Sequence, residues 1–218
     1  MAVVLAAGGG RRFDGASPKL LAPFGGRPLV SWSVEAAAGA GLDRVLVVSG
    51  AVDLRPAFDD LVSSARSGAS PGDRPVPAAP VTVVVNEDWE QGQASSLRVA
   101  LGWCRRQRCR AAVVGLGDQP LVPSSAWRAV ATAGAAPIVA ATYGGRRRNP
   151  VRLDRSVWPL LTGDGDDVGA RALMGRRPDL VHDVACEGDP DDVDTIADLR
   201  RLERCHPEIR AAGAARRR

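Results

Sequence analysis

The stretch AVVLAAGGGRRFDGASPKLL (residues 2–21) begins as a short apolar run and passes directly into three consecutive glycines. Two arginines follow the glycines, and a proline and a lysine lie further along the same stretch. An apolar run that ends in glycines is typical of a buried strand followed by a turn whose backbone can approach a ligand closely. The stretch therefore raises three possibilities: a dinucleotide-binding turn, a P-loop, or another type of phosphate-binding loop.

The first two possibilities fail on particular residues. A dinucleotide fingerprint needs GxGxxG, and Gly8 and Gly10 supply its first half, but Phe13 stands where the third glycine lets the helix pack closely on the strand. A P-loop needs a lysine followed by serine or threonine, and Lys19 is followed by Leu20, which has no hydroxyl for magnesium. Neither template explains the loop.

The third possibility accounts for the residues that the templates leave over. Glycines allow backbone N–H groups to approach a polyphosphate, and Arg12 and Lys19 add side-chain donors and positive charge. A flexible turn with exposed basic residues is the alternative interpretation. The stretch predicts a loop that wraps a triphosphate.

The rest of the chain alternates between strand-like and helix-like segments. We expect strands at 2–7, 44–49, 81–86, 111–116, 137–142 and 180–184, and helices at 28–40, 53–64, 95–106 and 124–133. This alternation predicts a three-layer α/β/α Rossmann-like fold with a mostly parallel central sheet. We expect a single domain over residues 1–210 and a disordered basic tail over 211–218.

In such sheets, ligands bind beyond the carboxyl ends of the strands, and acidic residues follow two of the predicted segments there. Asp118 comes just after the apolar run 111–116 and is placed to hold Mg²⁺, unless it caps the next helix, for which Ser124 or Ser125 is also available. Asp192 and Asp194 would point to the same side of an extended segment. A helix cap at this second segment is the alternative.

Two further segments are candidates for substrate contacts. Gly92, Gln93, Ser95 and Ser96 follow the predicted strand 81–86, and Ser95 could also be a helix N-cap. The basic turn at 146–150 is either a solvated hairpin tip or a surface for an anionic acceptor.

Composition narrows the function classes. The net charge of +4 suits an anionic small substrate, while scattered basic residues without interleaved aromatics give little reason to expect nucleic acid. No stretch approaches the roughly 18 apolar residues of a membrane span, and the four cysteines have no metal-site spacing and indicate reduced thiols. We expect a soluble cytoplasmic protein that contacts no membrane.

The opening stretch resembles the LAAGxGxRx6K signature of nucleotidyltransferases with the MobA-like NTP transferase fold, the nucleotide-diphospho-sugar transferase type. Further stretches resemble motifs of one branch, the molybdenum-cofactor cytidylyltransferases, in the same order: NEDWEQGQASSLRVAL (86–101), GLGDQPLV (115–122), GRRRNPVRL (145–153), DDVGARALM (166–174) and DDVDTIADLRRL (191–202). Asn149 departs from that branch, which has histidine before the proline.

The resemblance implies a Mg²⁺-dependent transfer of CMP from CTP to the molybdenum-molybdopterin cofactor, with release of pyrophosphate. A molybdenum hydroxylase would receive the product. Ala7 favours CTP, because guanylyl relatives tend to carry LAGG. Alternatives are another phosphorylated acceptor, such as a sugar 1-phosphate or phospholactate, with CTP or GTP, or a non-catalytic carrier of the molybdenum cofactor.

The same resemblance assigns roles to individual residues. Arg12, Lys19 and Asp118 are the expected catalytic residues, and Asp118 and Asp194 the expected metal ligands. The expected acceptor-binding residues are Arg147, Asn149 and Asp167. The expected nucleotide-binding residues are Leu5, Ala6, Ala7, Gly8, Gly9, Gly10, Arg12, Lys19, Gly92, Gln93, Ser95 and Ser96.

Overall fold

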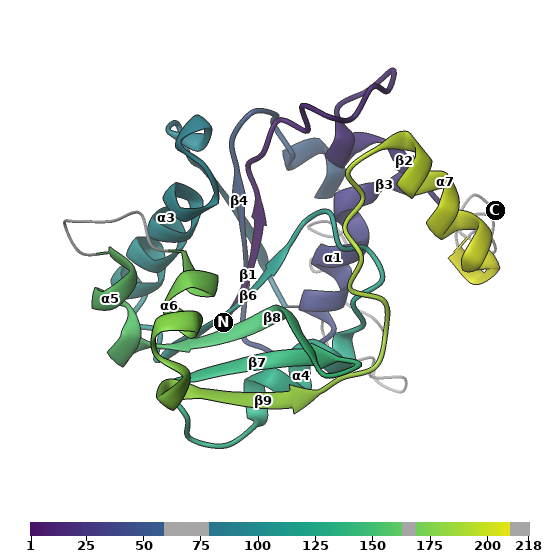
Figure 1. The fold of residues 1–218 in the computed structure, drawn as a ribbon. Coiled ribbons are helices and arrows are strands. Elements are labelled where there is room, and N and C mark those ends of the chain that lie inside the picture. The colour runs from purple at the N-terminus through teal and green to yellow at the C-terminus, as the bar shows by residue number, and fades with distance from the viewer. Residues whose placement is uncertain (59–78, 163–168, 210–218) are drawn as a thin grey trace, which may run out of the picture.

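A seven-stranded sheet forms the centre of the molecule in the computed structural model, which describes residues 1–58, 79–162 and 169–209 (Figure 1). In order across the sheet the strands are β5 (Val81–Val85), β4 (Val45–Ser49), β1 (Ala2–Ala6), β6 (Ala111–Leu116), β8 (Arg146–Asp154), β7 (Ile138–Tyr143) and β9 (Val181–Ala185). Neighbouring strands run parallel except at β8, which is antiparallel to both β6 and β7.

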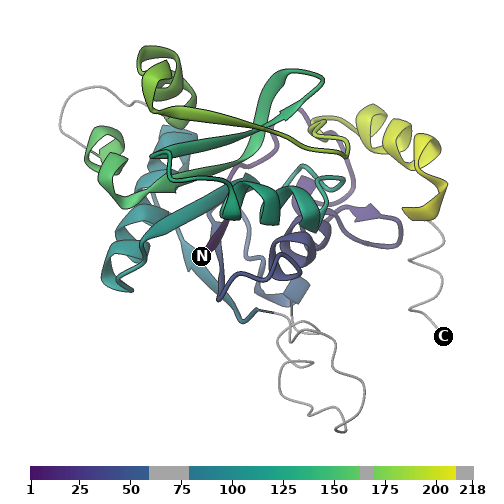
Figure 2. The same ribbon diagram turned by 90° about the horizontal axis from the view of Figure 1, so that it is seen from below.

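Helices cover both faces of this sheet, as Figures 1 and 2 show. One face carries α1 (Leu29–Ala38) and α4 (Ser124–Thr132), and the other carries α3 (Gln93–Arg106), α5 (Pro159–Thr162) and α6 (Ala170–Arg176). Helix α7 (Ile196–Cys205) packs instead beside the small hairpin of β2 (Pro23–Phe24) and β3 (Arg27–Pro28). Short 3-10 turns lie at Lys19–Leu21, Arg55–Phe58, Trp89–Gln91, Arg155–Val157 and Pro178–Leu180. The predicted three-layer, mostly parallel α/β fold is confirmed.

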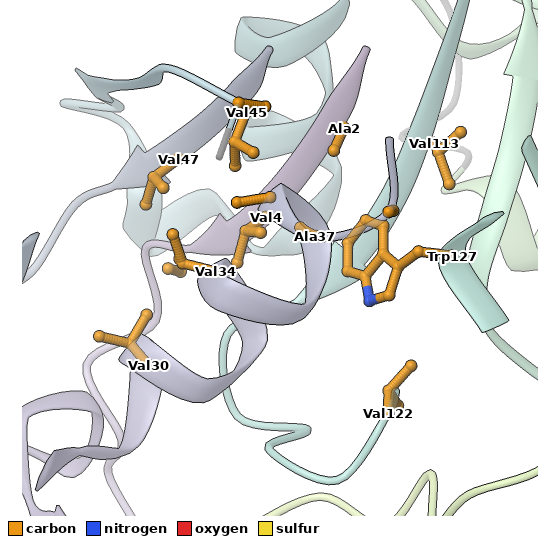
Figure 3. Close-up of a cluster of buried hydrophobic side chains, with 14 of the residues drawn as sticks. Ala2, Val4, Val30, Val34, Ala37, Val45, Val47, Val113, Val122 and Trp127 are labelled. Carbon is orange, nitrogen blue, oxygen red and sulfur yellow. The ribbon is translucent and has the colours of Figure 1, made fainter. Parts of the chain in front are cut away.

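The central strands are buried on both faces because both are covered by helices. All five residues of β1 and of β4 are buried, which is why their sequences read as unbroken apolar runs. Figure 3 shows Val4 of β1 packed against Val34 and Ala37 of α1, with the ring of Trp127 from α4 beside them. A Cβ at position 115 would lie 2.5 Å from that ring, so glycine in β6 admits the tryptophan.

All six predicted strands are present, with ends that differ by at most one residue, and β8 corrects the expectation that 146–150 is a turn. The turn is the glycine pair Gly144 and Gly145, whose φ angles of 56° and 75° close a hairpin between β7 and β8. The arginines 146–148 are exposed at the start of β8, so the segment lacks the apolar pattern of a strand. Of the predicted helix 53–64, the described part holds only the 3-10 turn Arg55–Phe58, and Asp167 and the tail 211–218 lie outside the described residues.

Candidate active site

The glycine loop leaves the sheet at its centre, between two parallel neighbours. Leu5 of β1 lies beside Leu116 of β6, and Ala6 lies beside Ser49 of β4, so the loop begins where three strands end together. Gly10 has a φ of 61°, and a Cβ there would lie 2.8 Å from the Cβ of Lys19. Glycine at this position therefore allows the loop to fold back on itself and bring Lys19 to the strand ends.

Four of the charged residues singled out from the sequence meet at this point. The ammonium of Lys19 donates to Asp118 Oδ2 at 2.7 Å and lies 3.5 Å from Asp194 Oδ1. The guanidinium of Arg12 donates to Asp194 Oδ2 at 2.8 Å. The Lys19 side chain is only 10% exposed, whereas that of Arg12 is 75% exposed. The cluster therefore extends from a nearly buried lysine to an arginine at the surface.

Backbone contacts hold the two aspartates near each other. Asp118 lies two residues after the end of β6. Its carbonyl accepts a hydrogen bond from Val193 N at 2.9 Å, which ties the segment before α7 to the end of β6. Thr195 is the N-cap of α7, and it forms a reciprocal capping box with Asp198. Asp194 is thus not the cap, and its carboxylate faces Lys19 and Arg12.

The cap interpretation also fails for Asp118. The N-cap position of α4 is Pro123, which makes no side-chain cap hydrogen bond, and Ser124 is already the first helical residue. The expectation that Ser124 or Ser125 caps this helix was therefore wrong.

Gln119, which sequence reasoning missed as an individual residue, connects the metal candidates to the acceptor candidates. It is 3% exposed, its Nε2 donates to the carbonyl of Pro190 at 2.9 Å, and its Oε1 accepts from Asn149 Nδ2 at 3.2 Å. The third carboxylate of this region, Asp192, has a raised pKa because of partial burial and the negative charges of Asp118 and Asp194, opposed by a Gln119 hydrogen bond. The signal was available in the sequence as a polar residue between an aspartate and a proline at a strand end.

A cavity of about 270 Å³ lies beside the charged cluster. Its lining residues are Leu5, Ala7, Gly8, Trp89, Gly92, Gln93, Ser96, Leu116 and Asp118. Six of the twelve expected nucleotide-binding residues are in this set; Ala6, Gly9, Gly10, Arg12, Lys19 and Ser95 are not.

Trp89 is a second residue that sequence reasoning missed. It stands in a 3-10 turn between β5 and α3, and a Cβ at Gly9 would lie 3.2 Å from its ring. A Cβ at Gly50 would lie 2.6 Å from the Cβ of Trp89, so glycine there gives the tryptophan room. An aromatic residue in a polar loop next to glycines was the available signal.

Ser95 holds the loop in place instead of lining the cavity. It lies within the first turn of α3, whose N-cap is Gly92, so the expectation of a Ser95 N-cap was wrong. Its hydroxyl donates to the carbonyls of Asp88 and Gly92 and accepts from the Asn86 amide at 2.8 Å.

The two described acceptor candidates have different surroundings. Asn149 lies next to the charged cluster through its hydrogen bond to Gln119. Arg147 lies two residues earlier in β8, and its Nε donates to Asp183 Oδ1 of the edge strand β9 at 2.6 Å. The structure thus ties Asn149, but not Arg147, to the aspartates.

The donor set of the aspartates fits a magnesium ion. One cationic group, the Lys19 ammonium, already lies within 3.5 Å of oxygens from both Asp118 and Asp194. Over the described ranges, no cluster of three or more acidic, histidine or cysteine side chains could hold a metal. Mg²⁺ typically binds one or two carboxylates and completes its shell with water and substrate phosphates, which this pair permits. Separately, no helix in the described part of the chain is long and apolar enough to cross a membrane.

Known proteins resemble this chain over most of its length. The chain is 30% identical over 211 residues to the nicotine blue oxidoreductase of Paenarthrobacter nicotinovorans, covering 92% of this chain and 94% of that protein. The crystal structure of Rv0371c from Mycobacterium tuberculosis H37Rv matches with a TM-score of 0.69 and 30% identity, over 92% of this chain and 95% of that chain. A second structure of Rv0371c, in complex with manganese, matches with a TM-score of 0.64 over 92% and 96%.

A more distant structure supports the fold alone. A nucleotidyl transferase from Methanothermobacter thermautotroptrophicus matches with a TM-score of 0.72 at 21% identity, over 95% of this chain and 97% of that chain. The family model described as the MobA-like NTP transferase domain matches residues 2–182, which include the glycine loop and Asp118. The chain therefore belongs to the family of MobA-like NTP transferase domains.

Proposed function

We propose that the protein is a Mg²⁺-dependent nucleotidyltransferase that transfers CMP from CTP to a phosphorylated acceptor, the molybdenum-molybdopterin cofactor. The observation that carries the proposal is the Lys19 ammonium between Asp118 and Asp194, beside a cavity at the end of the glycine loop. This arrangement supports the proposal because it brings groups suited to binding phosphate and groups suited to binding a metal to one place.

The reaction needs no nucleophile from the protein. A phosphate oxygen of the acceptor attacks the α-phosphorus of CTP, the bond from that phosphorus to the β-phosphate oxygen breaks, and pyrophosphate leaves with the electron pair. Arg12, Lys19 and the loop amides offset the charge on the β- and γ-phosphates. Magnesium, held by Asp118 and Asp194, would supply further charge neutralisation.

The cavity beside the loop is the proposed site for the base and ribose. Its volume of about 270 Å³ suits part of a nucleotide, with the triphosphate lying over the loop outside it. Gly92, Gln93 and Ser96 offer a backbone without Cβ, an amide and a hydroxyl. Trp89 adds an aromatic surface on which a base can stack.

The acceptor would approach from the side of β8. Asn149 is the stronger candidate for contacting it, because its amide lies against Gln119, next to the metal aspartates. Arg147 is paired with Asp183 and would have to exchange that partner for an acceptor phosphate, and Asp167 is retained from the sequence resemblance alone. A cytoplasmic location and delivery of the product to a molybdenum hydroxylase complete the proposal.

Pyrophosphate release tests the proposal directly. The full chain is incubated with Mg²⁺ and each of the four common NTPs, with and without molybdenum cofactor. Release with CTP alone, and only with the cofactor, supports the proposal. Release that requires GTP instead of CTP replaces the nucleotide but keeps the chemistry. No release under any condition favours a non-catalytic carrier of the cofactor.

A second candidate function is a redox reaction, and one observation favours it: the relative from Paenarthrobacter nicotinovorans is named a nicotine blue oxidoreductase, and the match spans 92% of this chain. Oxidation of NADH or NADPH in the presence of nicotine blue, followed by absorbance, tests this candidate. Turnover that survives substitution of Lys19 and Asp118 would separate it from nucleotidyl transfer.

A further inference from the structure

A second cavity, of about 570 Å³, lies at the opposite end of the central strands. Ala111, the first residue of β6, lines it, whereas Leu116, the last residue of the same strand, lines the candidate active site. The two cavities are therefore separated by the length of that strand, roughly 16 Å. In Figure 1 the N-terminus marks this end of β1, away from the glycine loop.

Arginines from three parts of the chain surround this basal cavity. Arg44 precedes β4, Arg108 and Arg110 lie in the connection from α3 to β6, and Arg152 lies within β8. Asp43 is the acidic residue among the lining residues. The cavity therefore carries an excess of positive charge.

The side chain of Arg152 is fixed in the wall of the cavity by hydrogen bonds. The residue is 9% exposed, and its guanidinium donates to the carbonyls of Ala131, Gly134 and Ala136 at 3.0, 2.8 and 3.2 Å. These three bonds fix a nearly buried positive charge in the cavity wall. The backbone at the end of α4 and just after it therefore sets the position of the guanidinium.

The other three arginines are exposed and offer unused donors. Within the described ranges, the side chains of Arg44, Arg108 and Arg110 have no hydrogen bond or ion pair, and all three are exposed. Guanidinium groups present paired N–H donors that match the oxygens of phosphate. The carboxylate of Asp43 could neutralise one of these guanidinium groups, so positive charge would remain in the cavity.

Arg108 is held in a backbone conformation that disfavours it. Its φ is 57°, and it is the one residue other than glycine with a positive φ in the described part of the chain. Helix ends of this kind prefer glycine. The last turn of α3 already contains Arg105 and Arg106 to complement its negative end, so the helix dipole does not require a further arginine.

We propose that this basal cavity binds a phosphate-bearing small molecule at a site separate from the candidate active site. The volume lies within the range of small-molecule sites, and the charge and donor geometry select phosphate groups. Because the two cavities lie at opposite ends of the sheet, both can be occupied at once. The shared chemistry is the polyphosphate, carried by a nucleotide or free in solution.

Isothermal titration calorimetry tests this site with inorganic tripolyphosphate and with CTP as probes. The candidate active site is first disabled by the double substitution Arg12→Ala and Lys19→Ala. Tripolyphosphate should still bind this variant, and adding Arg44→Gln and Arg110→Gln should weaken that binding by about tenfold or more. If CTP binds this variant as tightly as tripolyphosphate does, the site recognises the phosphates alone. If CTP binds more tightly than tripolyphosphate, the site also contacts the nucleoside.

The matched control removes two charges from the same end of α3 but outside the cavity. Adding Arg105→Gln and Arg106→Gln instead should change the residual binding by less than about twofold, because these exposed side chains do not line the cavity and their charges are screened by salt. The proposal is overturned if the Arg12 and Lys19 variant binds no tripolyphosphate, or if both arginine pairs weaken the binding equally. Circular dichroism verifies that each variant is folded.

Discussion

At the scale of single residues, the candidate site depends on charges that face one another. Lys19 is nearly buried against Asp118, so each of the two residues compensates the charge of the other. Arg12, by contrast, is mostly exposed and pairs with Asp194. Substitution of Lys19 or Asp118 should consequently affect both the reaction and the local structure, and substitution of Arg12 mainly the reaction.

We expect Lys19→Ala and Asp118→Ala each to lower the rate of pyrophosphate release by about a hundredfold or more, because one fixed charge near a transferring phosphate is worth about 2–4 kcal/mol. Arg11→Ala is the matched control, since Arg11 is 80% exposed and lies 3.9 Å from Glu90, whereas Arg12 and Lys19 pair with the aspartates. Steady-state kinetics of folded variants measure the effect. Near wild-type rates in both variants would contradict the proposed mechanism.

A prediction of a different kind concerns Gly10. Alanine there meets a φ of 61° and the Cβ of Lys19 at 2.8 Å, so Gly10→Ala should destabilise the protein by about 1–2 kcal/mol and also slow turnover. Gly102→Ala is the control, because this position in α3 is helical, has space for a Cβ and should be stabilised by about 0.5–1 kcal/mol. Urea unfolding measures both; a harmless Gly10→Ala would show that the loop conformation is not needed.

At the scale of elements, helix starts determine which carboxylates are available for chemistry. Thr195 and Asp198 satisfy the first turn of α7 between them, and this releases the neighbouring Asp194 to face the loop. The hydrogen bond from Thr195 lowers the pKa of Asp198 below its usual value, chiefly through the threonine side chain. The stability that this bond contributes is therefore present above the ordinary aspartate pKa of about 3.9 and is lost as pH falls through the lowered value.

The variant Asp198→Asn tests this dependence of the stability on pH. The variant should be less stable than the wild type near about pH 7, and the difference should shrink as the pH falls below about 4, because the amide cannot titrate. Urea unfolding of both proteins at several pH values measures the difference. A gap that stays constant down to about pH 3 would show that the carboxylate charge does not strengthen the cap.

Elements also show why the sequence predicted most of the fold but not all of it. The strands β1, β4 and β6 are buried on both faces and read as apolar runs, so their positions followed from the sequence alone. Strand β8 was missed because its first residues, Arg146 to Arg148, are exposed and charged. The charged cluster was predicted as separate residues, but its pairings depend on Val193 and Gly10, whose roles arise only from tertiary contacts.

At the scale of the whole molecule, the candidate site connects segments that are distant in the sequence. The glycine loop belongs to the first twenty residues, Asp118 follows the middle strand of the sheet, and Asp194 precedes the last helix. Anything that binds all three at once will couple to global stability, because it binds the folded chain and not the unfolded one.

We therefore expect CTP with Mg²⁺ to raise the melting temperature. At a concentration of about a hundred times the dissociation constant, the stabilisation is about 2.7 kcal/mol, which for a chain of this size corresponds to roughly 5–10 °C. CTP without Mg²⁺ should give a smaller increase. Asp118→Asn should reduce the part that depends on Mg²⁺, since the proposed metal site would keep one carboxylate in place of two. Differential scanning calorimetry measures these shifts, with Asp183→Asn as the control because Asp183 pairs with Arg147 away from the cluster. A Mg²⁺-dependent increase that persists in full in Asp118→Asn would place the metal elsewhere, and an equal increase with GTP would remove the preference for CTP.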